Sequence, residues 1–134
     1  MMEERHFTLD EASQMLPWLE TKFQELEPYR FEVDRCRTRV AELLVKSRGN
    51  GHGGNLDEEL HRLESMAQEL QKSIEDIVGQ ITARGIIVRD LDKGLVDFPA
   101  LRQGRTIHLC WIRGETDISF WHETDSGFAG RQPL

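Results

Sequence analysis

The 134-residue chain has few cysteines and no long apolar run, and both absences restrict its class. Its two cysteines, Cys36 and Cys110, lie far apart in segments of different kind, so we expect reduced thiols in a cytoplasmic protein. No stretch approaches the ~20 apolar residues of a membrane span, and we therefore expect no membrane partner. Residues 1–5 lack the apolar region of a signal peptide.

Positive charge is also scarce in this chain. There are 17 Lys and Arg residues against 24 Asp and Glu, which gives a formal net charge of -7. This balance excludes nucleic acid as the main partner, because its phosphates attract an excess of basic side chains. With 38% hydrophobic residues the chain can form a real core, and its length suits a single domain over residues 1–134.

The first half of the chain predicts a long amphipathic helix. Thr8 and Glu11 have the spacing of a capping box, and Phe7 precedes them as an apolar staple. We expect Pro17 to open a second helical stretch and Pro28 to kink it. From there, apolar residues recur every three or four positions, as on one face of a helix. They are Leu16, Leu19, Phe23, Leu26, Tyr29, Val33, Cys36, Val40 and Leu43.

A second helix follows the glycine-rich segment 49–55. That segment predicts a flexible loop and not a phosphate-binding loop, because no Lys-Ser or Lys-Thr pair follows its glycines. Asn55 and Glu58 have the spacing of another cap, and apolar residues alternate four and three apart from Leu56 to Ile81. We expect one helix to about residue 84, ended by the glycine that follows. Two such helices joined by a short loop predict an antiparallel, coiled-coil-like hairpin over residues 8–84.

The remaining residues, 85–134, predict a small antiparallel β-sheet with an irregular C-terminal tail. The apolar period changes to two, and short turns separate strands expected at 86–90, 95–98, 106–112 and 117–123. Pro99 is expected to stop the second strand, and Phe128 to anchor the tail. The predicted fold class is therefore α+β, a long helical hairpin followed by a small sheet.

The register of the last two strands decides which side chains share a face. A four-residue turn would oppose His108 with Trp121 and would place His122 on the apolar face. A three-residue turn would instead oppose His108 with His122. We prefer the first register, because it keeps the apolar side chains together. In either register His108 and Cys110 project on the same side of their strand.

Several short motifs occur along nearly the whole chain: Phe7–Ala12 with Leu16-Pro17, Leu95–Leu101, Leu109–Trp111, Gly114-Glu115, Trp121–Glu123 and Gly127–Arg131. Taken together, they resemble a bacterial family of small uncharacterised proteins, domain of unknown function 2203. The resemblance implies a small soluble protein without an established activity. It also implies that the position of His108 is often aromatic, which argues against His108 as a member of a site shared by the family.

Candidate chemistry gathers in the predicted sheet. Cys110, His122 and Glu123, with Asp97 or His108 near them, offer the donor types that zinc or iron binds. A catalytic alternative uses His122 as a base, Asp97 or Glu123 as its orienting carboxylate and Cys110 as the nucleophile. The chain lacks the spacing of common metal motifs, so we prefer the interpretation that Cys110 is a packing residue and His122 a donor at the core edge.

Two functions follow from these patterns. The first is a non-enzymatic interaction or scaffold protein that forms a homo-oligomer through helices 16–47 and 56–84, with a binding patch at Trp121 and Arg131 on the sheet. The second is a small metal- or ligand-binding protein, with or without enzymatic activity. We prefer the first, with no certain cofactor. Whether Cys110, His122, Glu123 and Asp97 converge in space distinguishes the two.

Overall fold

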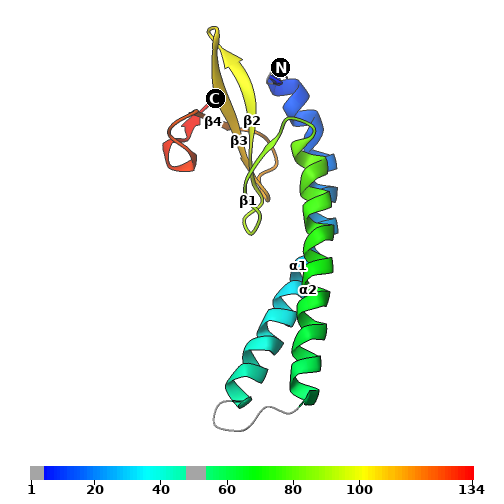
Figure 1. The fold of residues 1–134 in the computed structure, drawn as a ribbon. Coiled ribbons are helices and arrows are strands. Elements are labelled where there is room, and N and C mark those ends of the chain that lie inside the picture. The colour runs from blue at the N-terminus through cyan, green and yellow to red at the C-terminus, as the bar shows by residue number, and fades with distance from the viewer. Residues whose placement is uncertain (1–4, 48–53) are drawn as a thin grey trace. The chain divides into compact units, whose positions relative to one another are not determined.

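A computed structural model describes residues 5–47 and 54–134 and confirms the α+β fold class. Helices α1 (Leu9–Ser47) and α2 (Gly54–Thr82) precede the strands β1 (Ile87–Asp90), β2 (Leu95–Arg102), β3 (Arg105–Ile112), β4 (Phe120–Glu123) and β5 (Gln132–Pro133), with a short 3-10 helix, η1 (Phe128–Gly130), before β5 (Figure 1). The predicted loop 49–55 lies outside the described residues, apart from Gly54 and Asn55. These two residues begin α2, so Asn55 is inside the helix and is not its cap.

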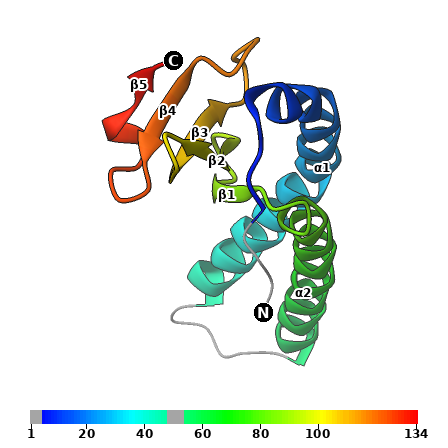
Figure 2. The ribbon, with the colours of Figure 1, turned by 90° about the horizontal axis from the view of Figure 1, so that it is seen from above.

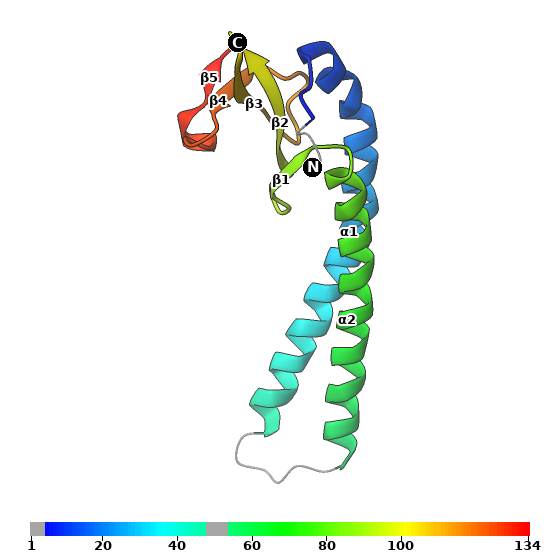
Figure 3. The same ribbon diagram turned by 45° about the horizontal axis from the view of Figure 1, so that its top comes forward.

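The chain forms two compact units. One contains the residues up to Phe23 together with Val78–Leu134, and the other is Gln24–Ile77. The second unit is made of the remaining turns of α1 and α2, which run antiparallel as predicted (Figure 3). One buried cluster of its core is formed by Cys36, Leu43 and Leu63, with Val40, Leu56, Leu60, Ala67 and Leu70 packed around them. These residues belong to the two apolar seams of the sequence, so the seams bury one another.

The start of α1 is fixed by its cap and by the sheet. The backbone N–H of Thr8 donates to Glu11 Oε1 at 2.9 Å, and the N–H of Glu11 donates to Thr8 Oγ1 at 3.1 Å, which confirms the capping box. Phe7 is buried, and its ring meets Phe98 of β2 edge to face at 5.2 Å. Its N–H donates to the carbonyl of Pro99 at 2.7 Å. The residue before the cap thus ties the helix to the sheet.

Pro17 does not open a separate helix, and that prediction is wrong. The helix α1 continues without interruption from Leu9 through Pro17 and Pro28 to Ser47; the kink at Pro28 stays a prediction. Proline removes one hydrogen bond from a helix interior. Ala12 and Leu19 on either side of Pro17 are completely buried, and their packing offsets that loss.

The five strands form an antiparallel meander in the order β1-β2-β3-β4-β5 (Figure 2). Contrary to expectation, Pro99 lies inside β2, which continues to Arg102. The carbonyl of Pro99 accepts a hydrogen bond from the N–H of Phe7. In a strand, the nitrogen and the carbonyl of one residue face the same side, so the nitrogen of Pro99 also faces the side of Phe7. On that side of β2 the pairing with β1 ends at Asp97, so the missing N–H of Pro99 leaves no bond to β1 unmade. A two-residue turn at Gln103 and Gly104, with φ of 52° and 80°, then leads into β3.

The preferred register of β3 and β4 is also wrong. His108 lies opposite His122, Leu109 opposite Trp121 and Cys110 opposite Phe120. Instead of a four-residue turn, residues 113–119 form a longer loop, which Glu115 holds by two hydrogen bonds. The backbone carbonyl of Glu115 accepts from the indole N–H of Trp111, and the carboxylate of Glu115 accepts from the backbone N–H of Ile112. Strand β4 therefore begins at Phe120 and not at residue 117.

This register separates the sheet into two different faces. Residues opposite one another in an antiparallel pair share a face. The apolar face carries Val96, Phe98, Ala100, Ile107, Leu109, Trp111 and Trp121. Phe7 and Phe23 contact Phe98 and Trp111 of this face, at centroid distances of 5.2 and 6.5 Å. The other face carries Asp97, His108, Cys110, Phe120 and His122, so His122 and Phe120 lie opposite to where the preferred register placed them.

Candidate functional site

Four side chains with metal-binding or acid–base chemistry meet on the second face of the sheet. Asp97 lies opposite Cys110 across β2 and β3, and His108 lies opposite His122 across β3 and β4. All four are buried, with exposed fractions of 5% or less. Ligand atoms of Asp97, Cys110 and His122 lie within 4.8 Å of one another. The sheet thus brings a carboxylate, a thiol and an imidazole from three strands to one buried point.

Asp97 is the centre of this group. Its Oδ1 lies 2.9 Å from His122 Nε2, and its Oδ2 accepts a hydrogen bond from Arg89 Nε at 2.8 Å. His108 Nδ1 lies 3.5 Å from the same Oδ2, and the rings of the two histidines are nearly perpendicular, with centroids 5.4 Å apart. A buried carboxylate is stable only when hydrogen bonds or opposite charges compensate it. Here Arg89 and His122 provide that compensation.

The orientation of His122 is fixed through its other nitrogen. Nδ1 lies 2.7 Å from the backbone carbonyl oxygen of Glu123. A carbonyl only accepts hydrogen bonds, so Nδ1 carries a hydrogen and donates it. The second nitrogen, Nε2, is left to face Asp97 and Cys110. A histidine that donates Nδ1–H to a backbone carbonyl is arranged to bind a metal through Nε2.

Cys110 is a protonated thiol in this environment. Burial, followed by the negative charge of Asp97, raises the pKa of Cys110 from 9.0 to about 12, against a smaller opposing effect of Arg131. The nucleophilic form of cysteine is the thiolate. Moreover, the thiol hydrogen-bonds to Asp97, while the two nitrogens of His122 face Glu123 and Asp97. The geometry therefore provides no histidine base in contact with the thiol of Cys110 among these hydrogen bonds.

A second ion pair supports the strand that carries Cys110. Arg131 Nη2 donates to both carboxylate oxygens of Glu115, at 2.8 and 2.9 Å, and lies 3.3 Å from the carbonyl of Cys110. Its guanidinium also stacks on Phe120 and Phe128, at 4.2 and 4.8 Å from the ring centroids. The tail is thus held over the second face. Sequence reasoning missed the role of Glu115, whose only signal was its place in the Gly114-Glu115 motif.

Other predicted site residues lie elsewhere. Glu123 is on the opposite face to Cys110 and pairs with Arg105; only its backbone carbonyl reaches the site, through His122. Trp121 is buried on the apolar face, with the guanidinium of Arg102 4.4 Å from its ring centroid. Arg131 stacks over the second face. Trp121 and Arg131, the two members of the predicted binding patch, therefore lie on opposite faces of the sheet.

The fold and the site define a small α+β protein with a buried Asp–His–Cys cluster. Residues 5–134 match the family described as "Uncharacterized conserved protein (DUF2203)", and because the match covers nearly the whole chain, the chain belongs to that family. No curated protein and no solved structure matches it. Within residues 5–47 and 54–134, neither helix is long and apolar enough to cross a membrane.

Proposed function

We propose that this protein binds a divalent transition metal, zinc or iron, through Asp97, Cys110 and His122. The observation that carries the proposal is the convergence of three different donor atoms within 4.8 Å at a buried point. This convergence supports a metal- or ligand-binding protein over a plain interaction protein. Glu123 does not contribute its carboxylate, which leaves Asp97 as the acidic ligand.

The chemistry of the three donors suits these metals. Zinc is bound in proteins by cysteine sulfur, histidine nitrogen and carboxylate oxygen, and iron accepts the same kinds of ligand. Asp97 Oδ1 and His122 Nε2 are the atoms that face the centre of the cluster. With thiolate and carboxylate bound, two negative charges balance the charge of the cation. These negative charges lower the free energy needed to bury the cation.

Hydrogen bonds behind the donors support the same assignment. Arg89 holds Asp97 through Oδ2, and the carbonyl of Glu123 holds His122 through Nδ1, so in both residues the other donor atom is directed inward. In metal sites such outer contacts orient the ligands and typically change affinity 10- to 100-fold when removed. His108 is a neighbour of the cluster and belongs to this outer group, through its approach to Asp97.

The proposal is tested by metal analysis of untagged protein. Elemental mass spectrometry of the purified native chain should find zinc or iron in stoichiometric amount. After removal of the metal with a chelator, calorimetric titration with zinc should show saturable binding. Cys110→Ser and His122→Ala should each lose stoichiometric binding.

A matched control for this test is Cys36→Ser, which changes the other buried cysteine; Cys36 belongs to the helical unit, whereas the cluster belongs to the other unit. It should keep the metal content of the wild-type protein. Native protein without stoichiometric metal, together with stripped protein that takes up no zinc, would show that the cluster is a structural hydrogen-bond network only.

A further inference from the structure

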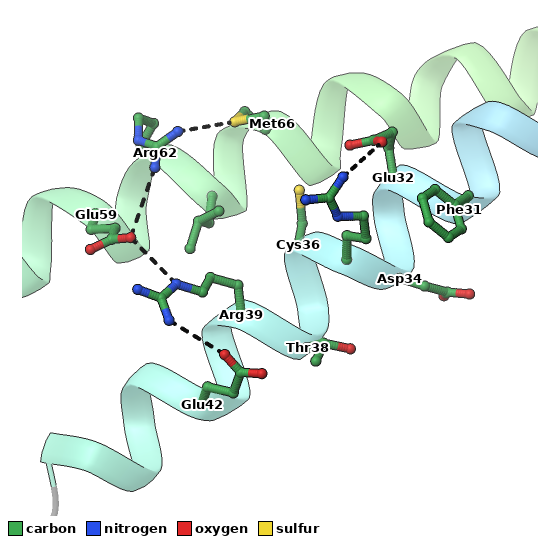
Figure 4. Close-up of a pocket in the computed structure, with 12 residues that line it drawn as sticks. Phe31, Glu32, Asp34, Cys36, Thr38, Arg39, Glu42, Glu59, Arg62 and Met66 are labelled. Atoms are coloured by element: carbon green, nitrogen blue, oxygen red, sulfur yellow. Dashed lines mark hydrogen bonds and ion pairs between the residues drawn. The ribbon is translucent and has the colours of Figure 1, made fainter.

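A groove in the helical unit is lined by both helices and has a volume of about 720 Å³. Cys36 of α1 and Leu63 of α2, both buried in the core of this unit, form part of its lining (Figure 4). Phe31 and Met66 also line it, and they remain 62% and 40% exposed. A groove with such exposed apolar walls suits an amphipathic helix laid into it.

The apolar surface continues along α1 beyond this groove. A second hollow of about 390 Å³ is lined by Thr38, Ala41 and Val45, and Val45 is 64% exposed. Phe31, Thr38 and Val45 are spaced seven residues apart and therefore form one stripe along the helix. The buried residues Cys36 and Leu43 have the same spacing on a different face. Helix α1 thus carries two seams: among the residues that the structure describes, the seam of Cys36 and Leu43 is buried, and the stripe of Phe31 and Val45 is exposed. A seam with heptad spacing is the surface that another helix covers in a coiled coil.

The charges beside this stripe have both signs. Arg39 lies 3.4 Å from Glu42 and 3.7 Å from Glu59. Arg35 lies 3.6 Å from Glu32, and these side chains are largely exposed. Exposed ion pairs contribute little free energy, so they can exchange partners readily. A strongly acidic or basic partner would meet like charges here.

A second copy of the same chain matches this charge pattern. Arg35 and Glu42 are also seven residues apart, and both line the groove. When two copies of α1 are laid antiparallel about a two-fold axis between these positions, Arg35 of each copy lies opposite Glu42 of the other. Interfaces of this self-complementary kind are the commonest in homodimers.

We propose that the groove and the Phe31–Thr38–Val45 stripe form the interface of a two-fold, antiparallel homodimer. The two hairpins together then make a four-helix assembly. This inference is independent of the metal site, because all the residues that carry it belong to the helical unit.

Sedimentation analysis over a micromolar concentration range tests the inference with the full-length chain. The wild-type protein should be dimeric. Phe31→Glu and Val45→Glu should weaken the dimer at least tenfold, and their helical circular dichroism should stay that of the wild type, because both side chains are exposed. Leu101→Glu is the matched control: Leu101 is 60% exposed but lies on β2, and its substitution should leave the dimer unchanged.

A charge exchange then tests the antiparallel register. Arg35→Glu alone and Glu42→Arg alone should each weaken the dimer, and the two together should restore it. Three results would overturn the inference: a wild-type chain that stays monomeric up to ~100 μM, a dimer insensitive to Phe31→Glu and Val45→Glu, or a different protein bound at this face in place of the second copy. An exchange that fails to restore a dimer broken by both single variants would overturn the antiparallel arrangement.

Discussion

The buried pair formed by Asp97 and His122 should be strongly coupled in stability. Their contact is 2.9 Å long, and both side chains are only 2% exposed. Removing one partner leaves the other buried without its charge-assisted hydrogen bond, which typically costs about 3–5 kcal/mol. We therefore expect Asp97→Ala and His122→Ala each to lower the free energy of unfolding by about 3 kcal/mol. The double variant should lose about 2 kcal/mol less than the sum of the two, since the pair is removed only once.

A variant of Arg89, the second partner of Asp97, is the control for this comparison of single and double variants. Arg89 is 2.8 Å from the carboxylate, but its side chain is 44% exposed, so water can replace much of the contact. We expect Arg89→Ala to cost no more than about 1 kcal/mol. All variants are compared by urea unfolding in excess chelator, so that bound metal does not contribute. Single effects that add within about 0.5 kcal/mol would contradict the coupling and hence the arrangement of the cluster.

Three further measurements test other parts of the structure. Thr8→Ala removes the hydroxyl that accepts the hydrogen bond from the N–H of Glu11, while the backbone N–H of residue 8 can still donate to Glu11, and it should lower the free energy of unfolding by about 1 kcal/mol. The backbone N–H of Thr8, followed by its hydroxyl, lowers the pKa of Glu11 below 4.5. The variant keeps the first contact and loses the second, so part of its loss of stability should disappear as the pH falls through that lowered pKa; urea unfolding at pH 7 and about pH 3 measures the difference. The thiol of Cys110, with its pKa of about 12, should resist iodoacetamide at pH 8 in metal-free folded protein; labelling as fast as in urea would contradict this prediction. The free energy of unfolding should also fall from pH 9 to 12, because the thiol of the unfolded chain loses its proton at a lower pH than the thiol of the folded chain. Gly94→Ala should destabilise more than Gly104→Ala in thermal unfolding: both have positive φ, but an added Cβ meets a side-chain atom at 2.6 Å only at Gly94.

The helical half was largely predictable, because its signals are local. The spacing of Thr8 and Glu11 identifies the cap, and the apolar alternation from Leu56 to Ile81 identifies one helix. The errors in this half concern proline and boundaries. Pro17 was expected to begin a helical stretch, yet burial of its neighbours keeps it in the helix interior. Such burial depends on the tertiary structure and is not visible in local spacing.

Predicting the site required the register of the sheet, which local patterns did not give. Asp97, Cys110, His108 and His122 were all identified as candidates by residue type. Their convergence depends on the pairing of His108 with His122, and a shift of one residue would have moved His122 to the other face. That pairing follows from a loop held by Glu115, a tertiary feature rather than a turn motif.

The most direct test of the proposed function is an anomalous diffraction measurement at the zinc absorption edge, on crystals of zinc-loaded protein. We predict a single strong peak of anomalous difference density in each chain, between Asp97 Oδ1, Cys110 Sγ and His122 Nε2. In these crystals Nδ1 of His122 should still donate to the carbonyl of Glu123, as it does now. Zinc found elsewhere, with the Asp97–His122 hydrogen bond unbroken, would contradict the proposed metal site.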